Sequence, residues 1–312
     1  VHPPNFPAMA TTMNSKHTPH SSGVLIKPIS VCSPEKAKNR GRKMIVGNEA
    51  PARDRLLANF HTHTSRCHHA VGEDREYVES AIALGIKTLG FSDHSPYFFD
   101  GDYYSHFRMR PEEFEGYIKS LLSLREEYKN DIDIYIGVEA EYYPKHFGKL
   151  CDFLSGYPID YMIMGQHYLG NEYDGTNSCN IYTEEKDLES YVSQVTEGLS
   201  SGKYAYIAHP DIFQFRGDEK IYEKHMGRLC ETAKALGIPL EINFLGIRAS
   251  RHYPRKDFFR VAAEIGNKVI FGCDAHSPTE LEYRKEFDFA VKEYADPMGL
   301  ERTEQIKLTL RK

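Results

Sequence analysis

The stretch NFHTHTSRCHHA (residues 59–70) continues a short apolar run, LLANF (56–60), and places four histidines and a cysteine within twelve residues. Three interpretations of this cluster are open. It forms a zinc knuckle by itself, it is a solvated polar loop, or it supplies part of a site that other segments complete. The choice depends on whether the rest of the chain repeats the pattern of an apolar run that ends in polar side chains.

The same pattern occurs six more times. Apolar runs rich in β-branched and aromatic residues are typical of strands, and here they occupy 88–94, 134–142, 161–168, 204–210, 239–244 and 268–276. Segments with helical spacing of apolar residues separate the runs, and most of them close on glycine, a common helix stop; they occupy 74–85, 109–128, 185–202, 222–237 and 255–266. Seven strands alternating with helices predict βαβ units and an α/β fold with a parallel sheet.

Two architectures fit this alternation, an open doubly wound sheet and a closed barrel. Neither G-x-G-x-x-G nor G-x-x-x-x-G-K-[ST] follows any of the runs, which disfavours a nucleotide-binding doubly wound fold. The polar side chains that end the runs favour a barrel of the TIM type, whose active site lies at the C-terminal ends of the strands.

Metal-ligand side chains end every one of the seven runs. They are His61 and His63, Asp93 and His94, Glu139 and Glu141, Gln166 and His167, His209 and Asp211, Glu241 and Asn243, and Asp274 and His276. Residues i and i+2 of a strand point to the same side, so both imidazoles of H-x-H can face one point. Imidazole and carboxylate together suit zinc, iron or manganese. The seven ends therefore predict a shared metal site, although a single histidine among them would be weak support.

Glu139 lies inside an apolar run, where an unpaired carboxylate is costly to bury. A bridging position between cations would remove that cost. Glu141 is open to three interpretations: a base behind a metal ligand, a substrate contact, or a solvated residue at the strand end.

Composition excludes several classes of protein. The chain of 312 residues has a formal net charge of −6, which gives no reason to expect a nucleic-acid or membrane-surface partner. No apolar run approaches the roughly 20 residues of a membrane span. The six cysteines are far apart and form no C-x-x-C pair, so reduced thiols in a cytoplasmic protein are expected rather than a disulfide framework or a four-cysteine zinc site. The oligomeric state stays open.

The first 50 residues differ from the rest of the chain. They are rich in Pro, Ser, Thr and His and show no hydrophobic period, so they cannot bury enough apolar surface to order themselves. We expect a disordered or spurious leader at 1–50 and one catalytic domain at 51–312.

The motifs resemble the PHP family of metal-dependent phosphoesterases over about residues 55–290. The resemblance implies a distorted (β/α)7 barrel that holds three divalent metal ions. It also implies nine ligands, all present in this sequence: His61, His63, His69, His94, Glu139, His167, His209, Asp274 and His276. The amidohydrolases also begin with H-x-H, but they expect a lysine at the fourth strand, where this chain has MGQHY, and a lone aspartate at an eighth strand.

Within the family, stretches such as FSDHSPY, GVEAEY and AHPDIF resemble the stand-alone histidinol-phosphate phosphatases. The resemblance implies hydrolysis of L-histidinol phosphate in histidine biosynthesis. The alternatives are another small phosphate monoester, such as a nucleotide or sugar phosphate, and a metal-binding barrel without catalysis.

Hydrolysis of a phosphate monoester needs further groups. Arg216 and Arg248 follow the fifth and sixth predicted strands, where the resemblance also places phosphate-binding arginines, and arginine can grip phosphate in bidentate fashion. A cationic amino alcohol favours nearby carboxylates, for which Asp93, Glu141 and Asp211 are candidates. Asp93 and Asp211 can instead orient a ligand imidazole. His252, in the loop after the sixth strand, is a candidate proton donor to the leaving oxygen.

Overall fold

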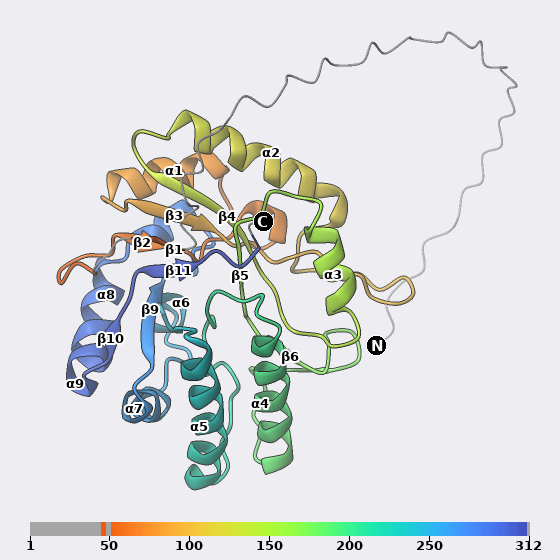
Figure 1. Ribbon diagram of the computed structural model, residues 1–312, viewed down its shortest axis with the longest axis vertical. Helices are drawn as coiled ribbons and strands as arrows, with labels where there is room; N and C mark the ends of the chain where they lie inside the picture. Colours follow the sequence, from red (N-terminus) through yellow and green to blue (C-terminus); the bar gives the residue numbers. More distant parts are fainter. Residues whose placement is uncertain (1–44, 48–50, 311–312) are drawn as a thin grey trace, which may run out of the picture. The chain divides into compact units, whose positions relative to one another are not determined.

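The helices begin and end close to the amphipathic segments of the sequence. The computed structural model describes residues 45–47 and 51–310 (Figure 1). Pro111 opens α2, the Asp218 side chain accepts the Lys220 and Ile221 N–H groups at the start of α5, and Gly237 ends α5 with φ 65°. The helices are α1 (Asp74–Ala83), α2 (Pro111–Glu127), α3 (Phe147–Leu154), α4 (Glu185–Ser200), α5 (Glu219–Leu236), α6 (Phe244–Arg248), α7 (Lys256–Ile265), α8 (Arg284–Ala290) and α9 (Asp296–Met298), with shorter helical turns at η1 (Ser65–Cys67), η2 (Pro278–Leu281) and η3 (Val291–Ala295).

The strands form a curved parallel sheet in two main parts. One part has the order β2-β3-β4-β5 and the other β10-β9-β8, and every pairing within them is parallel. Two antiparallel pairs, β1-β11 and β6-β7, lie outside these parts. The strands are β1 (Ile45–Gly47), β2 (Ala58–Asn59), β3 (Thr88–Phe91), β4 (Asp133–Glu139), β5 (Tyr161–Ile163), β6 (Tyr168–Leu169), β7 (Thr176–Asn177), β8 (Leu240–Asn243), β9 (Lys268–Gly272), β10 (Glu301–Arg302) and β11 (Gln305–Lys307).

The segment at 204–210, which the sequence predicts as the fifth strand, is not a regular strand. Ile207 makes isolated parallel bridges to Met164 on one side and Leu240 on the other, so the segment joins β5 to β8 through single residues. Its continuation is blocked because His209 has a positive φ of 33° and Pro210 has no N–H to donate. The prediction of an α/β fold with a parallel sheet is confirmed, whereas the closed (β/α)7 barrel stays a prediction.

The alternation of strand residues divides the core into two clusters. Phe60, Tyr161, Tyr206 and Ile270 belong to an inner cluster with Val46 of β1 and neighbouring residues. A larger cluster packs the helices against the outer surface of the sheet, and Figure 1 shows α5 and α7 side by side near β9. Every residue of β3 and β8 is buried, as expected for parallel strands covered on both faces.

Three residues of the predicted leader belong to a strand. Ile45–Gly47 form β1, which pairs with Gln305–Lys307 of β11 in antiparallel register, and Val46 is buried. The other residues of the predicted disordered or spurious leader at 1–50 lie outside the described part of the chain.

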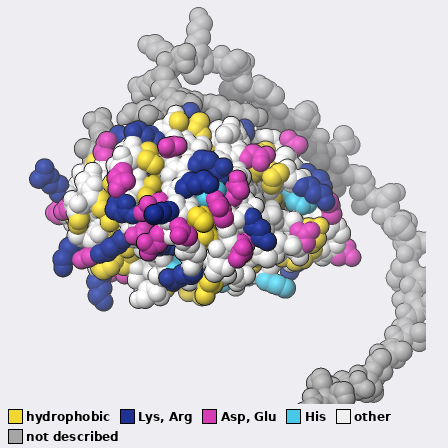
Figure 2. Space-filling model, turned by 90° about the horizontal axis from the view of Figure 1, so that it is seen from below, with side chains coloured by type: hydrophobic (Ala, Val, Ile, Leu, Met, Phe, Trp, Pro, Cys, Tyr) yellow, Lys and Arg dark blue, Asp and Glu magenta, His cyan; other side chains and the backbone are white. Residues whose placement is uncertain are grey.

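The surface carries mixed charge. On the face shown in Figure 2, basic and acidic side chains are interspersed, and ion pairs such as Lys224–Glu185, Arg260–Glu223 and Lys256–Glu293 join neighbouring elements. Among the described residues, no helix is both long and apolar enough to cross a membrane.

Candidate metal centre

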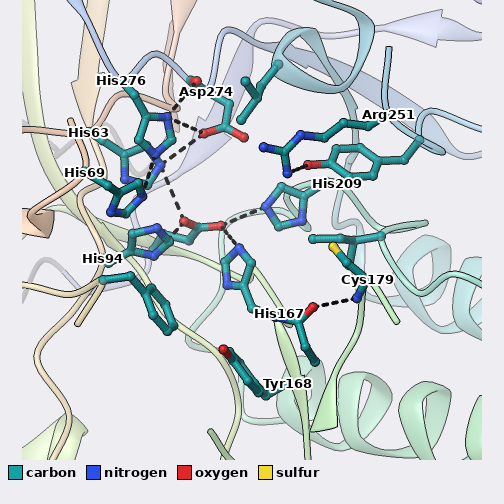
Figure 3. A pocket seen from close by; sticks show the side chains of 16 residues that line it. His63, His69, His94, His167, Tyr168, Cys179, His209, Arg251, Asp274 and His276 are labelled. Atoms are coloured by element: carbon teal, nitrogen blue, oxygen red, sulfur yellow. Dashed lines mark hydrogen bonds and ion pairs between the residues drawn. The ribbon is translucent and has the colours of Figure 1, made fainter. Parts of the chain in front are cut away.

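Nine side chains from seven places in the chain meet at the C-terminal ends of the parallel strands. Most of them appear together in Figure 3. His61 and His63 follow β2, and His69 comes from the loop after η1. The other six lie at or just after strand ends or strand-like segments: His94, Glu139, His167, His209, Asp274 and His276.

Glu139 lies at the centre of this group and is 1% exposed. Its Oε1 atom is 3.0 Å from His209 Nε2 and 3.5 Å from His167 Nε2. Its Oε2 atom is 3.1 Å from His94 Nδ1, 3.6 Å from His63 Nε2 and 3.7 Å from His61 Nε2. Burial alone would raise the pKa of Glu139, but the surrounding imidazoles outweigh it and hold the pKa well below its usual range. Glu139 is therefore an anion within reach of five imidazoles.

Asp274 supplies a second carboxylate. Its Oδ1 atom is 3.1 Å from His63 Nε2 and 3.4 Å from His61 Nε2. Asp274 has φ 48° and His209 has φ 33°. Such left-handed conformations of non-glycine residues cost about 1–3 kcal/mol each and cluster at functional sites. Here they turn both side chains toward the group around Glu139.

His69 and His276 face each other, with their Nε2 atoms 3.0 Å apart. Burial lowers the pKa of His276 to about 3 and also lowers the pKa of His69. His69 Nδ1 lies 2.8 Å from the Cys67 carbonyl and His276 Nδ1 lies 3.2 Å from the Asp274 carbonyl. Because a carbonyl only accepts, Nδ1 carries the proton in each neutral ring, and the two Nε2 lone pairs face and repel each other. A cation bound to both nitrogens at the usual 2.0–2.1 Å would turn that repulsion into attraction.

Three of the imidazoles are held from behind by a buried carboxylate. His61 Nδ1 lies 2.8 Å from Glu241 Oε1, and His167 Nδ1 lies 2.8 Å from Glu141 Oε1. His63 Nδ1 lies 3.4 Å from Asp93 Oδ1. A carboxylate at Nδ1 fixes the proton there and leaves the Nε2 lone pair free, as in carboxylate–histidine–zinc arrangements.

The donor set fits divalent cations. Four buried polar atoms that face the group have no hydrogen-bond partner among the described residues, which is costly unless a ligand satisfies them; they are His61 Nε2, His63 Nε2, His94 Nδ1 and Glu139 Oε2. Several sets of three converge closely enough to hold an ion, among them His61–His63–Asp274, His61–Glu139–His209 and His69–His94–His276. His167 is outside these sets but lies 3.5 Å from Glu139 Oε1. Nitrogen and oxygen donors of this kind suit zinc, manganese and iron.

A cavity of about 410 Å³ opens over these side chains. The nitrogen- and oxygen-rich wall includes His63, His94, Glu139 and Asp274. The rest of the lining is formed by Phe107, Tyr168, Asn177, Cys179, Ile212, Leu245, Arg251 and Tyr253. The rings of Phe107 and Tyr168 are stacked, with their centroids 5.9 Å apart. The volume is in the range of sites for small molecules.

The three predicted carboxylates lie behind the cavity. Asp93 contacts His63 and also accepts the Thr64 hydroxyl. Glu141 contacts His167 and Arg108. Asp211 accepts the Arg255 N–H, and burial raises its pKa to about 7. Their predicted substrate contacts stay predictions, and the geometry of Asp93 matches the alternative of orienting an imidazole.

His252 is not among the residues that line the cavity. Its Nε2–H donates to the Ile212 carbonyl at 2.7 Å, and burial lowers its pKa. The Ile212 residue that it contacts lines the cavity. The predicted role of His252 as proton donor stays a prediction.

The predicted arginines differ in environment. Arg248, at the end of α6, has two buried donors, Nε and Nη1, without a partner among the described residues, while its Nη2 is 3.6 Å from Glu280. Arg216 is exposed. Among the described residues, the arginine that lines the cavity is Arg251, whose Nη1 lies 3.3 Å from the Tyr253 hydroxyl.

The sequence predicts no role for Arg251 or Arg108, and it places Glu241 only among the polar side chains that end the strands. Glu241 carries the same signal as Glu139, an acid inside an apolar strand, and that signal was available. Arg251 and Arg108 lie in loops whose course no hydrophobic period reveals.

Comparison with known proteins agrees with this geometry. The model of the PHP domain family matches residues 59–244. The chain is 32% identical over 253 residues to a protein of Deinococcus radiodurans named as a probable histidinol-phosphatase, covering 78% of this chain and 94% of the relative. It is 30% identical over 239 residues to a histidinol-phosphatase of Lactococcus lactis, covering 71% of this chain and 84% of the relative.

The fold has a counterpart among solved structures. A crystal structure of histidinol phosphate phosphatase from Lactococcus lactis, in complex with zinc, L-histidinol and phosphate, superposes with a TM-score of 0.59 at 19% identity. The match covers 82% of this chain and 98% of that chain.

Proposed function

Because the protein belongs to the PHP domain family, we propose that it is a metal-dependent phosphatase that hydrolyses L-histidinol phosphate to L-histidinol and phosphate. The observation that carries this proposal is the cavity whose one wall is the imidazole and carboxylate cluster around Glu139. The relatives named as histidinol-phosphatases support the choice of substrate.

Three divalent cations, zinc, manganese or iron, would be held by the nine side chains. Support comes from three separate convergences: His61 and His63 with Asp274, Glu139 with His209, and His69 with His276. His94 and His167 complete the donor set around Glu139. Divalent cations at such sites lower the pKa of water and neutralise charge on phosphoryl oxygens.

The remaining residues of the cavity would bind and orient the ester. Arg251 reaches into the cavity, and Arg248 has unpartnered donors near His276, whose backbone N–H is bound by the same Glu280 carboxylate. Guanidinium donors of this kind can bind the non-bridging oxygens of phosphate. The stacked rings of Phe107 and Tyr168 offer an apolar surface for a planar substituent such as the imidazole of histidinol.

We also infer that the seven strand segments close into the distorted (β/α)7 barrel. Ile207 bridges both β5 and β8, and Thr62 bridges Ala275 in parallel, so each gap between the two sheet parts contains a backbone link. The cytoplasmic location expected from the sequence is part of the same proposal, and cell fractionation tests it.

The substrate is tested by phosphate release. The enzyme is purified and loaded in turn with zinc, manganese or iron. Release is then measured from L-histidinol phosphate, nucleoside monophosphates and sugar phosphates, with a His167→Ala variant as the background control. We expect the highest kcat/KM for L-histidinol phosphate. Equal or faster turnover of another ester would refute the substrate, and no release from any ester by metal-loaded protein would refute the phosphatase.

A further inference from the structure

Arg108 is a cation in the interior of the protein, with none of its side chain exposed. It lies in the loop between β3 and α2, and the proposed function assigns it no role. Burying a guanidinium is costly unless acceptors and negative charges surround it. The residues that Arg108 contacts therefore indicate its role.

The guanidinium joins three segments. Nη2 donates to Glu141 Oε1 at 2.9 Å, just beyond β4, and Nη1 donates to the Ser95 carbonyl at 3.2 Å, just beyond β3. Nε donates to Glu172 Oε2 at 2.8 Å, in the connection between β6 and β7, and Nη2 also contacts that oxygen. These directions require the planar fork of arginine, which a lysine ammonium does not offer.

Glu141 connects Arg108 to the cluster around Glu139. The oxygen that accepts from Arg108, Oε1, is also the one 2.8 Å from His167 Nδ1. His167 Nε2 then lies 3.5 Å from Glu139 Oε1. Arg108 thus reaches the centre of the cluster through one shared oxygen atom and one imidazole ring.

Arg108 also contacts Phe107, a residue that lines the cavity. Its guanidinium lies 4.5 Å from the centroid of the Phe107 ring, and Phe107 lines the cavity. The Phe107 ring lies 6.2 Å from that of His167. The buried guanidinium of Arg108 therefore supports both the Phe107 ring and the His167 imidazole.

We propose that Arg108 is a positioning residue: it holds the Glu141 carboxylate against His167 Nδ1, so that His167 Nε2 stays directed at the metal-binding cluster. The inference rests on the proposed metal-binding role of His167. Glu172 is the second carboxylate that accepts from Arg108.

The direct test is metal affinity. Zinc affinity and stoichiometry are measured by chelator competition, and the visible absorption of the cobalt-loaded protein reports ligand geometry. We expect Arg108→Met to weaken the affected zinc site by about 10–100-fold, the usual effect of losing a partner behind a metal ligand, and to change the cobalt spectrum. The Arg108→Lys variant should keep a charge but not the fork, and should lie between Arg108→Met and the wild type.

Arg125→Met is the matched control. Arg125 also binds a buried carboxylate, that of Asp160, which accepts the Ile136 N–H at 2.9 Å on β4. This substitution should lower stability and leave zinc affinity and the cobalt spectrum unchanged. Equal zinc affinity in Arg108→Met and the wild type, with only stability lowered, would reduce Arg108 to a structural residue and overturn the inference.

His167→Ala separates this inference from the proposed function. If His167→Ala weakens zinc binding and Arg108→Met does not, only the role of Arg108 is wrong. If neither weakens it, the ligand role of His167 is wrong as well. Should Arg108→Met fail to fold, Arg108→Lys decides, because wild-type affinity in that variant excludes a role for the guanidinium geometry.

Discussion

The Nδ1 atom of His61 lies 2.8 Å from Glu241 Oε1, and neither side chain is exposed to solvent. The other oxygen of Glu241 accepts the His209 N–H at 2.9 Å and the Asn243 amide at 2.8 Å. Glu241 is thus fixed on both oxygens and directs His61 Nε2 toward Glu139 and Asp274. This relationship assigns Glu241 to orienting His61.

Replacing Glu241 with glutamine should weaken metal binding without unfolding the protein. The amide keeps the shape of the side chain, but it removes the charge that fixes the proton on His61 Nδ1. We expect zinc affinity to fall about 10–100-fold, as measured by chelator competition. Glu189→Gln on the exposed surface of α4 is the matched control. Unchanged affinity in Glu241→Gln would contradict the orienting role.

A methyl group at Gly165 should displace Glu139. A Cβ atom there would lie 1.8 Å from Glu139 Oε1 and 2.8 Å from His167 Cε1, so the carboxylate must move. We expect Gly165→Ala to lose at least about tenfold in zinc affinity, together with most of the phosphate release.

Gly116→Ala is the control for the glycine substitution. Gly116 is exposed in α2, and a Cβ atom there would have open space around it. Because alanine restricts the unfolded chain and favours helix, we expect stability to rise by about 0.5–1 kcal/mol, as measured by chemical denaturation. Full zinc affinity in Gly165→Ala would show that Glu139 does not need its present position.

The sequence predicts the strand ends well because parallel strands have a simple geometry. The i and i+2 spacing of His61 and His63 places both imidazoles on one side, and the structure brings both within 4 Å of Asp274 Oδ1. The segment at 204–210 departs from prediction, because the backbone at His209 adopts a positive φ that no apolar pattern encodes.

The polar supports behind the site are harder to predict. Arg108 and Glu141 are 33 residues apart, and Arg108 and Glu172 are 64 apart, so only the loop conformations bring them together. Position along the chain favoured Arg216 as a phosphate ligand, yet Arg216 is exposed and Arg251 lines the cavity. Loop residues of this kind lack the periodicity that places strand and helix residues.

Removing the metals should destabilise the protein as well as inactivate it. The cluster contains buried atoms without partners and two ring nitrogens 3.0 Å apart, so the metal-free state is unfavourable. A ligand present at 100 times its Kd stabilises a protein by about 2.7 kcal/mol. We expect dipicolinate to lower Tm in calorimetry, and zinc to restore both Tm and activity. An unchanged Tm after complete metal removal would mean that the cluster is stable without cations.

The loss of kcat/KM on replacing an arginine should depend on how close that arginine lies to the cavity. Arg251→Met and Arg248→Met should each lower kcat/KM by a factor equivalent to about 1.5–3 kcal/mol, the value of a charge-assisted contact. Arg216→Met should have a smaller effect, because its side chain is exposed. Arg228→Met on α5, where Arg228 bonds Ser193 Oγ, is the control. Phosphate binding by Arg251 is wrong if Arg251→Met stays within about twofold of the wild type.

Cys179 should report occupancy of the cavity. Its thiol is half-buried and lines the cavity beside Arg251, and burial raises its pKa. Cys151 on α3 is also half-buried with a pKa raised by burial, but it lies outside the residues that line the cavity. The two thiols therefore share partial burial and a raised pKa, and they differ in their relation to the site.

Saturating the enzyme with L-histidinol and phosphate should slow alkylation of Cys179 and leave Cys151 unaffected. At ten times the Kd of the ligands, mass action leaves about a tenth of the cavity free, so we expect roughly tenfold slower modification, measured on separate peptides by mass spectrometry. Equal slowing of both cysteines would indicate a global change in the protein rather than occupancy. No slowing of Cys179, with product binding verified by calorimetry, would place the products away from the wall formed by Cys179 and Arg251.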